Sequence, residues 1–227
     1  FFNSSLRTRL STQKAALNLG MDPIVMNVSG DAWGIEFGEG TVMNGNTAEH
    51  IKEAAAVVSQ YCDIIAVRAF PSLTDKEKDE SEHVLKSFIE FASVPVVSME
   101  SATGHPLQGL TDAITIFENS TKKKPKVVLS WAPHIKALPH AVANSFVQAM
   151  QKMDVEFVVT NPEGYNLSSE ITKDTSICHN QEEAFKNADF VYTKNWSSYD
   201  DYGKTQATET NWMITKEKIG NAKFMHC

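Results

Sequence analysis

The stretch Phe1-Phe2-Asn3-Ser4-Ser5-Leu6-Arg7-Thr8-Arg9 is the point from which the rest of this chain can be interpreted. An apolar pair typical of a strand end runs into a small polar turn, and a helical pattern of leucine and alanine follows at once. Ser5 is a good N-cap, and the first turn behind it offers free backbone N–H groups to an anion. Arg7 and Arg9 oppose the helix dipole there, which makes sense if a doubly charged anion such as phosphate binds. An ordinary N-cap with two solvated arginines is the alternative, and spacing alone does not separate the two.

Composition excludes several classes of protein. The chain has 227 residues, with 28 acidic and 21 basic side chains giving a net charge of -7 and no basic patch, so nucleic acid is not expected as a partner. No stretch has the length of a membrane-spanning helix or the pattern of a signal peptide, so no membrane partner is expected. Three scattered cysteines, Cys62, Cys178 and Cys227, suit neither a disulfide framework nor a zinc site and favour a reducing cytoplasm.

Apolar runs and helical patterns alternate along the chain, which predicts an α/β fold with parallel sheets. Strands are expected at residues 23–28, 64–67, 94–99, 127–131, 156–160 and 189–193. Helices are expected from residue 6 and at residues 47–61, 75–91, 107–117, 141–153 and 182–186. The charged segment at 118–126 separates two such blocks. We therefore predict two doubly wound parallel-sheet domains, at residues 1–120 and 121–227, from a chain that resembles a fragment cut at both ends.

Polar side chains follow several of the predicted strands. Because ligands of open parallel sheets bind at the carboxyl ends of the strands, these residues are expected at one edge, facing the Arg7 turn. They are Arg68, Glu100, His105, His134 and Lys194. Each has a simple surface or capping explanation when taken singly, but together they indicate an anionic substrate held between two domains.

Three motifs resemble the aspartate and ornithine carbamoyltransferase family. Ser5-Leu6-Arg7-Thr8-Arg9 resembles its phosphate-binding Ser-x-Arg-Thr-Arg motif, and His105-Pro106-Leu107-Gln108 resembles its His-Pro-x-Gln motif. His226-Cys227 resembles the start of its His-Cys-Leu-Pro motif. The motifs occur in the family's order and span the whole chain, so the resemblance is strong.

Within the family, the sequence is most similar to the branch that acts on Nα-acylated ornithine. The segments that carry this likeness are Asp31-Ala32-Trp33, Gly40-Thr41-Val42-Met43, Val67-Arg68-Ala69-Phe70-Pro71, Ser98-Met99-Glu100 and Lys194-Asn195-Trp196. Ordinary ornithine carbamoyltransferases carry an Asp that matches Lys194 and pairs with the free α-ammonium. A lysine would repel that ammonium and suits a substrate whose α-nitrogen is a neutral amide.

The resemblance implies roles for the remaining candidate residues, with no metal and no cofactor required. Phosphate would be bound by Ser5, Leu6, Arg7 and Thr8, and by Trp33 of a neighbouring subunit in a homotrimer. The carbamoyl group would be bound by Arg68 and by the motif His105, Pro106, Leu107 and Gln108. The catalytic residues would be Arg68, His105, Gln108 and Cys227, the first three stabilising the developing oxyanion. The acylornithine would be held by Glu100, His134, Lys194 and Cys227. Cys227 as a covalent nucleophile is a competing idea, but no residue near it in the sequence activates it.

Ala48 bears on the length of the acyl group. The matching position tends to be Glu in the acetyl-specific branch and Pro in the succinyl-specific one, and Ala removes a charge that would repel a succinyl carboxylate. The segment from Glu100 to His105 is also one residue longer than expected of acetyl-type enzymes. We therefore expect N-succinyl-L-ornithine as the substrate, with Ala48 as an indifferent helix-start residue in the simplest alternative.

Three other functions compete with this prediction. An acetylornithine carbamoyltransferase is the main enzymatic alternative, because Lys194 argues against free ornithine. A non-catalytic homologue or an inert fragment is the second, although the retained phosphate-binding motifs argue against a regulatory homologue. A generic nucleotide-binding Rossmann protein predicts a Gly-x-Gly-x-x-Gly turn after the first strand, and the sequence has none.

Overall fold

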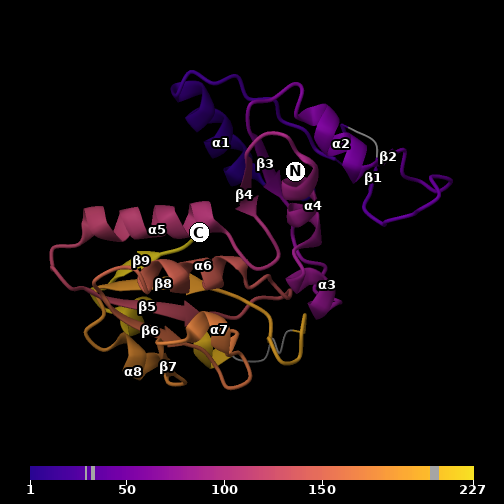
Figure 1. Cartoon of the computed structure of the whole chain (residues 1–227). Helices are drawn as coiled ribbons and strands as arrows, with labels where there is room; N and C mark the ends of the chain where they lie inside the picture. Colours follow the sequence, from indigo (N-terminus) through magenta and orange to yellow (C-terminus); the bar gives the residue numbers. More distant parts are fainter. Residues whose placement is uncertain (29, 32–33, 205–209) are drawn as a thin grey trace. The chain divides into compact units, whose positions relative to one another are not determined.

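The computed structural model describes residues 1–28, 30–31, 34–204 and 210–227, which form two compact units (Figure 1). Unit 1 comprises Phe1–Phe70 and Glu80–Ser101, and unit 2 comprises Pro71–Asp79 and Ala102–Cys227. Helix α5 (Pro106–Asn119) belongs to unit 2 because it packs closely on α6 (Ala141–Met150): a Cβ on Gly109 would lie 2.7 Å from the Ser145 backbone oxygen. The predicted boundary near residue 120 concerns ligand-binding domains and stays a prediction.

Unit 1 is built on the parallel pair β3 (Ile65–Arg68) and β4 (Val96–Glu100), with the short parallel pair β1 (Ile35–Glu36) and β2 (Glu49–His50) beside α2 (Ile51–Val58). The Phe2 N–H donates to the Arg68 oxygen at 2.9 Å, so the apolar pair at the chain start is bonded to β3, although it forms no strand of its own. The core of unit 1 is apolar and comes from α2, β3, α4 (His83–Phe91) and Phe2.

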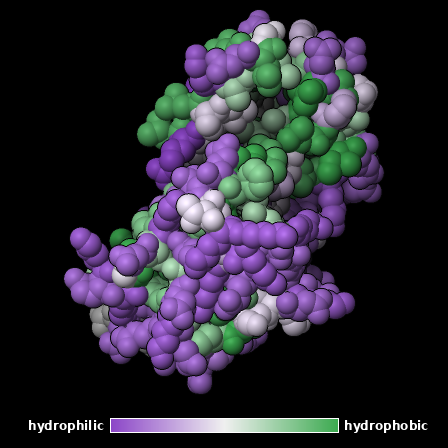
Figure 2. Space-filling view, turned by 90° about the vertical axis from the view of Figure 1, so that its left-hand side faces the viewer, coloured by the Kyte–Doolittle hydropathy of each residue, from purple (hydrophilic) through white to green (hydrophobic). Residues whose placement is uncertain are grey.

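Helix α1 (Leu6–Asn18) begins where the sequence predicts, with Ser5 as its N-cap. Its apolar stripe does not join the core, since α1 has no buried residue and Leu6 and Leu19 are both 74% exposed. On the face drawn in Figure 2, hydrophobic residues cover large areas between hydrophilic ones.

Three expectations for the first hundred residues are wrong. Residues 23–28 form no strand, and α2 begins at Ile51 with the His50 ring as its cap instead of Thr47. The expected helix at 75–91 is two helices, α3 (Lys76–Glu80) and α4. Glu82 interrupts them because its backbone is left-handed, with φ of 56°, and its carboxylate accepts from the Ser101 hydroxyl at 2.8 Å.

Unit 2 contains a five-stranded, fully parallel sheet in the order β7-β6-β5-β8-β9. The strands are β5 (Lys126–Trp131), β6 (Glu156–Thr160), β7 (Ser176–Cys178), β8 (Phe190–Lys194) and β9 (Lys223–Met225). The three central strands lie where predicted because they are long and apolar on both faces. The edge strands β7 and β9 were not predicted, since each is only three residues long.

Helices cover both faces of this sheet, as a doubly wound fold requires (Figure 1). Helices α5 and α6 pack on one face, while α8 (Gln181–Phe185) and α9 (Lys216–Ile219) pack on the other. Two short elements, α7 (Ser169–Thr172) and η1 (Thr210–Trp212), complete the unit. The predicted α/β class with parallel sheets is therefore confirmed. Within the described part of the chain, no helix has the length and apolar character needed to cross a membrane.

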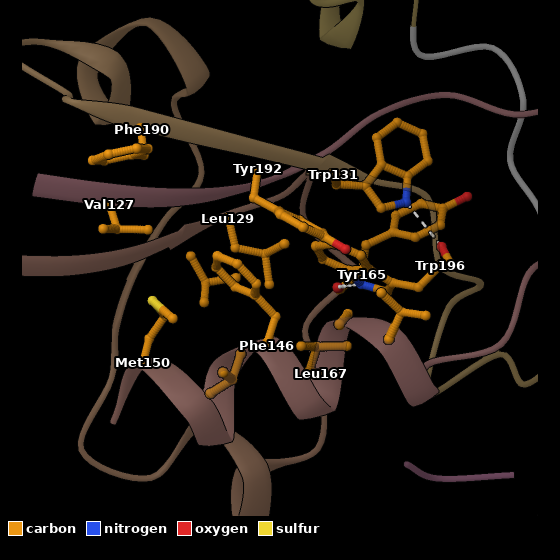
Figure 3. Packing of buried hydrophobic residues seen from close by; sticks show 14 of the residues in the cluster. Val127, Leu129, Trp131, Phe146, Met150, Tyr165, Leu167, Phe190, Tyr192 and Trp196 are labelled. Carbon is orange, nitrogen blue, oxygen red and sulfur yellow. Dashed lines mark hydrogen bonds between the residues drawn. The ribbon is translucent and has the colours of Figure 1, made fainter. Parts of the chain in front are cut away.

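The apolar core of unit 2 packs against its central strands (Figure 3). The Trp131 Nε1 donates to the Trp196 oxygen and the Trp196 Nε1 donates to the Tyr165 oxygen, both at 2.8 Å. Tyr192 stacks on Phe146 with ring centroids 4.2 Å apart. Both tryptophans are fully buried, so the segment after β8 is fixed where it leaves the sheet.

The sheet of unit 2 has one topological switch point. The chain runs from β5 outward through β6 to β7, and then returns to the other side of β5 as β8. Strands β5 and β8 are parallel, with Trp131 opposite Lys194 at their carboxyl ends. In open α/β sheets the crevice at such a point binds the ligand.

Candidate active site

The first group of candidate residues lies at the N-terminus of α1, in unit 1. Ser5 has extended backbone, and its Oγ accepts from the Thr8 N–H at 3.2 Å. The other N–H groups of the first turn have no carbonyl within the helix, and the turn contains no acidic residue. Leu6, Arg7 and Arg9 are exposed, and no ion pair joins either arginine to an acid among residues 1–28, 30–31, 34–204 and 210–227. The turn therefore has the donors and the charge of an anion site.

Arg68 lies beside this turn and is almost fully buried. Its Nη2 is 3.0 Å from Glu100 Oε2, and both side chains are 6% exposed. Its Nη1 donates to the backbone oxygen of Asn3 at 3.0 Å and of Ser4 at 3.4 Å, just before the N-cap. Burial lowers the pKa of the Arg68 guanidinium, and the charge of Glu100 opposes that change. Arg68 thus anchors the anion turn, while its Nε has no hydrogen-bond partner in the described structure.

Glu100 does not stand alone as a substrate ligand, because it forms an ion pair with Arg68. The β3–β4 register sets Arg68 opposite Glu100, with an irregularity between Val67 and Arg68. The Glu100 carboxylate therefore supplies the counter-charge that a buried guanidinium requires. Its predicted contact with acylornithine stays a prediction.

The second group lies in unit 2 and begins with the N-terminus of α5. His105 is the N-cap, and its Nδ1 accepts from the Gln108 N–H at 3.4 Å. The His105 N–H donates to Ser145 Oγ at 2.7 Å, which fixes the cap against α6. Because Nδ1 accepts, the neutral ring carries its proton on Nε2, which makes Nε2 a donor. Pro106 occupies the first helical position and Leu107 is 40% exposed, so the motif keeps its helix-start geometry.

The Gln108 side chain is held by a residue that the sequence did not single out. Its Nε2 donates to Asp112 Oδ1 at 2.8 Å, one helical turn further along α5. Asp112 is only 4% exposed, and burial raises the pKa of its carboxyl to about 6. Burial and the nearby Asp112 and Cys227 also raise the pKa of the Tyr192 hydroxyl. A lone acid four residues from Gln108 in an amphipathic helix is the sequence signal that could have identified Asp112.

The third group lies at the switch point of the unit 2 sheet. Lys194 ends β8 and is half-buried, and the Ala132 N–H donates to its backbone oxygen at 3.2 Å. The Asn195 Nδ2 donates to the Ala132 oxygen at 2.7 Å, so the segment after β5 is tied to the segment after β8. In the parts of the chain that the structure describes, Lys194 Nζ has no hydrogen-bond or ion-pair partner. His134 follows β5 on the same edge, is exposed, and accepts from the Lys136 N–H at 3.1 Å.

The remaining candidates have less structural support. Ala48 is exposed and its N–H donates to the Gly34 oxygen at 3.2 Å, next to the start of β2. Cys227 is half-buried against the apolar core of unit 2. Trp33 lies outside the described residues, so its predicted role is unchanged.

Each unit thus brings together part of the predicted set. Unit 1 joins Arg68 and Glu100 to the anion turn at Ser5. Unit 2 joins His105 and Gln108 to a buried acid, and it presents a lysine without a partner among the described residues at the switch point. These groups can recognise an anion, a group with both a donor and an acceptor, and a second negative charge.

Comparisons with known proteins identify the family. A model of the aspartate/ornithine carbamoyltransferase carbamoyl-P binding domain matches residues 1–118, and one of the Asp/Orn binding domain matches residues 139–227. The chain is 48% identical to N-succinylornithine carbamoyltransferase from Bacteroides fragilis, with all of this chain and 73% of that protein aligned. It is 35% identical to N-acetylornithine carbamoyltransferase from Xanthomonas campestris, with all of this chain and 74% of that protein aligned.

Solved structures agree with these matches. A crystal structure of a mutant N-acetyl-L-ornithine transcarbamylase complexed with carbamyl phosphate and N-succinyl-L-norvaline superposes with a TM-score of 0.93 at 35% identity. An acetylornithine transcarbamylase complexed with acetylcitrulline superposes with a TM-score of 0.92 at 36% identity. In both comparisons all of this chain is covered, and 75% of the solved chain. This chain therefore belongs to the aspartate/ornithine carbamoyltransferase family.

Proposed function

We propose that the protein carrying this chain transfers the carbamoyl group of carbamoyl phosphate to the δ-amine of N-succinyl-L-ornithine. The products are N-succinyl-L-citrulline and phosphate, a step of arginine biosynthesis. Membership of the family supports the carbamoyl transfer. The 48% identity to an N-succinylornithine carbamoyltransferase, against 35% to an N-acetylornithine carbamoyltransferase, supports the acyl group.

The observation that carries the choice of an acylated substrate is the environment of Lys194. A half-buried ammonium without an acidic partner in the described structure attracts a carboxylate and repels a free α-ammonium. Acylation turns the α-nitrogen of ornithine into a neutral amide and leaves carboxylate charge for Lys194 to bind. His134 and Glu100 would contact the same substrate.

The groups at the N-terminus of α1 and at the N-terminus of α5 suit carbamoyl phosphate. The N–H donors of the first turn of α1, with Arg7 and the side chains of Ser5 and Thr8, would bind its phosphate. The His105 Nε2–H is a donor suited to the carbonyl oxygen, where negative charge develops, and Arg68 would support it. The Gln108 oxygen is an acceptor suited to the carbamoyl NH₂ group.

The reaction then needs little covalent participation by the protein. The neutral δ-amine attacks the carbonyl carbon, a new N–C bond forms, and the C–O bond to phosphate breaks with its electron pair leaving on phosphate. The proton lost by the attacking nitrogen passes to the phosphate, so atoms and charge balance. Positioning of the two substrates and stabilisation of the oxyanion by His105 would supply most of the rate. Cys227 would lie beside the amine and the carbamoyl group.

Ala48 supports the longer acyl group. Three solved neighbours are N-acetyl-L-ornithine transcarbamylases in which a glutamate is replaced by serine, valine or alanine, and all three are complexed with N-succinyl-L-norvaline. We infer that this glutamate matches Ala48. A small neutral residue at this position leaves space for the longer succinyl group and does not repel its carboxylate.

The resemblance also supports an assembly and a location. We propose a homotrimer in which Trp33 of one subunit completes the phosphate site of its neighbour, acting in the cytoplasm. Light scattering of the purified protein tests the trimer. A monomer with full activity would contradict the role proposed for Trp33.

The proposed function is tested on the protein that carries this chain, with carbamoyl phosphate and one of three amines. Turnover is expected with N-succinyl-L-ornithine and not with free ornithine, since Lys194 disfavours the α-ammonium. Preferred turnover of N-acetyl-L-ornithine would keep the Lys194 argument and contradict the Ala48 argument. Preference for free ornithine would contradict both, and no activity with any amine would indicate a non-catalytic homologue.

Lys194→Met keeps the apolar stem and is expected to raise the KM for the acylornithine, with Lys136→Met, on the nearby loop, as the matched control.

A further inference from the structure

Asp112 is a buried acid for which the mechanism above has no use. It lies on the inner side of α5 with 4% of its surface exposed, and its Oδ1 accepts from Gln108 Nε2 at 2.8 Å. Its Oδ2 has no hydrogen-bond partner in the described structure. Carboxylates are rarely buried to this degree unless a cation or a full set of donors compensates them.

The Gln108 amide and the Tyr192 hydroxyl compensate the charge of Asp112 only in part: both lower the pKa of its carboxyl, but burial raises it by more. Helix α6, which packs on α5, contains no charged residue. From β8, Tyr192 faces the carboxylate, and Cys227 lies close to the same hydroxyl. No ion pair joins Asp112 to a cation within residues 1–28, 30–31, 34–204 and 210–227. An acid in this setting lowers stability, so its presence calls for a role other than holding the fold together.

The role follows from what a carboxylate can and cannot do. A side-chain amide can rotate by about 180° and present either its NH₂ or its oxygen to a neighbour. An ionised carboxylate only accepts, so Gln108 must direct its NH₂ towards Asp112. The Gln108 oxygen then points the other way, and within the described chain it makes no hydrogen bond.

We propose that Asp112 is a positioning residue that locks the Gln108 amide with its oxygen turned towards the substrate, which makes Gln108 an obligate acceptor for the carbamoyl NH₂ group. The inference rests on the proposed function, because it deepens the recognition of carbamoyl phosphate at the same site. It also assigns a specificity: an acyl phosphate with a methyl in place of NH₂ gains nothing from this arrangement. Asp112 thereby selects a carbamoyl group over an acetyl group without touching it.

Binding of two acyl phosphates tests the idea. Calorimetric affinities for carbamoyl phosphate and acetyl phosphate are measured on the wild-type protein and on Asp112→Asn, which has the same shape but can both donate and accept. Asp112→Asn is expected to weaken carbamoyl phosphate binding about fivefold to tenfold, the difference between a charge-assisted and a neutral hydrogen bond, and to leave acetyl phosphate binding unchanged. A purely structural role for Asp112 would weaken both ligands equally, and that result would overturn the proposal.

A double-mutant cycle in turnover provides a second test. Asp112→Asn is expected to lower kcat in the wild-type background and to have no further effect on Gln108→Ala, because the acid acts through that amide. Additive effects would overturn the proposal. Asp112→Glu keeps an acceptor-only carboxylate and is expected to retain the preference for carbamoyl phosphate; should Asp112→Asn fail to fold, Asp112→Ser takes its place.

Controls separate this inference from the proposed function. Asp154→Asn removes the same charge from an exposed site, where the acid forms only an exposed ion pair with Lys124 at 3.7 Å, and is expected to change neither affinity. A wild-type protein that neither binds carbamoyl phosphate nor turns over would contradict the proposed function itself. A wild-type protein that is active, with an unaltered preference in Asp112→Asn, would contradict only the role of Asp112.

Discussion

Replacement of Asp112 by Asn is expected to stabilise the protein at neutral pH. The pKa of the Asp112 carboxyl rises from its ordinary value of 3.8 to about 6 because burial disfavours the charged form. Each pKa unit corresponds to 1.36 kcal/mol, so ionised Asp112 costs the folded state about 3 kcal/mol. Asparagine keeps the shape of the side chain and an acceptor for Gln108 but carries no charge to bury.

The sign of the pH dependence follows from the two pKa values. Below pH 3.8 the carboxyl is neutral in both the folded and the unfolded state, and the cost is absent. Between pH 3.8 and about 6 the folded state binds the proton more tightly, so wild-type stability falls as the pH rises through this window. Above it, both states are ionised and the full cost remains. The stability difference between Asp112→Asn and wild type therefore increases as the pH rises across this window and stays constant above it.

The assay is urea unfolding of both proteins at several pH values, with thermal melting as a second measure. At pH 7.5, a gain of about 3 kcal/mol corresponds to a Tm increase of roughly 6–12 °C for a chain of this length. Asp154→Asn, at an exposed site, is expected to show no such difference at any pH. A difference in the free energy of unfolding that does not change with pH would refute the reasoning, and so would an Asp112→Asn protein less stable than wild type at pH 7.5.

Three further predictions concern the candidate site. Arg7→Ala is expected to raise the KM for carbamoyl phosphate about tenfold to hundredfold, measured by steady-state kinetics, since it removes a charge-assisted bond to phosphate. Ala48→Glu is expected to lower kcat/KM for N-succinyl-L-ornithine at least about tenfold and to spare N-acetyl-L-ornithine, because it places a negative charge near the succinyl carboxylate. Glu100→Gln is expected to lower the free energy of unfolding by about 3–5 kcal/mol in urea titrations, because it leaves the Arg68 guanidinium buried without its counter-charge.

Each has a matched control. Arg9→Ala removes the same charge two residues from Arg7, so an equal effect on KM would contradict a specific role for Arg7. Ala48→Gln has the length of glutamate without its charge; an equal loss of succinylornithine turnover would show that size, not charge, matters. Lys52→Met breaks the exposed pair with Glu39 and is expected to cost less than about 1 kcal/mol.

Sequence patterns were most successful where the structure depends on close neighbours along the chain. The Ser5 cap, the start of α5 at the His105 motif and the central strands of unit 2 all lie where capping residues and apolar periodicity predict. Edge strands and the interrupted helix at Glu82 were missed. Short strands carry too little pattern of their own, and the left-handed turn at Glu82 goes with a hydrogen bond to Ser101, which no local preference signals.

What the sequence determined by itself is the order of parallel strands and helices, the family, and the residue types presented after each strand, because periodicity, capping and motifs act over a few residues. What only the tertiary structure decided is which of those residues meet. The β3–β4 register joins Arg68 to Glu100, and the packing of α5 on the sheet brings Asp112 up to Tyr192. Both pairings are between residues more than thirty positions apart, and both depend on buried charge. Register and burial are properties of packed elements, so the sequence could name the candidate ligands and the helical spacing of Gln108 and Asp112, but not the burial of that acid.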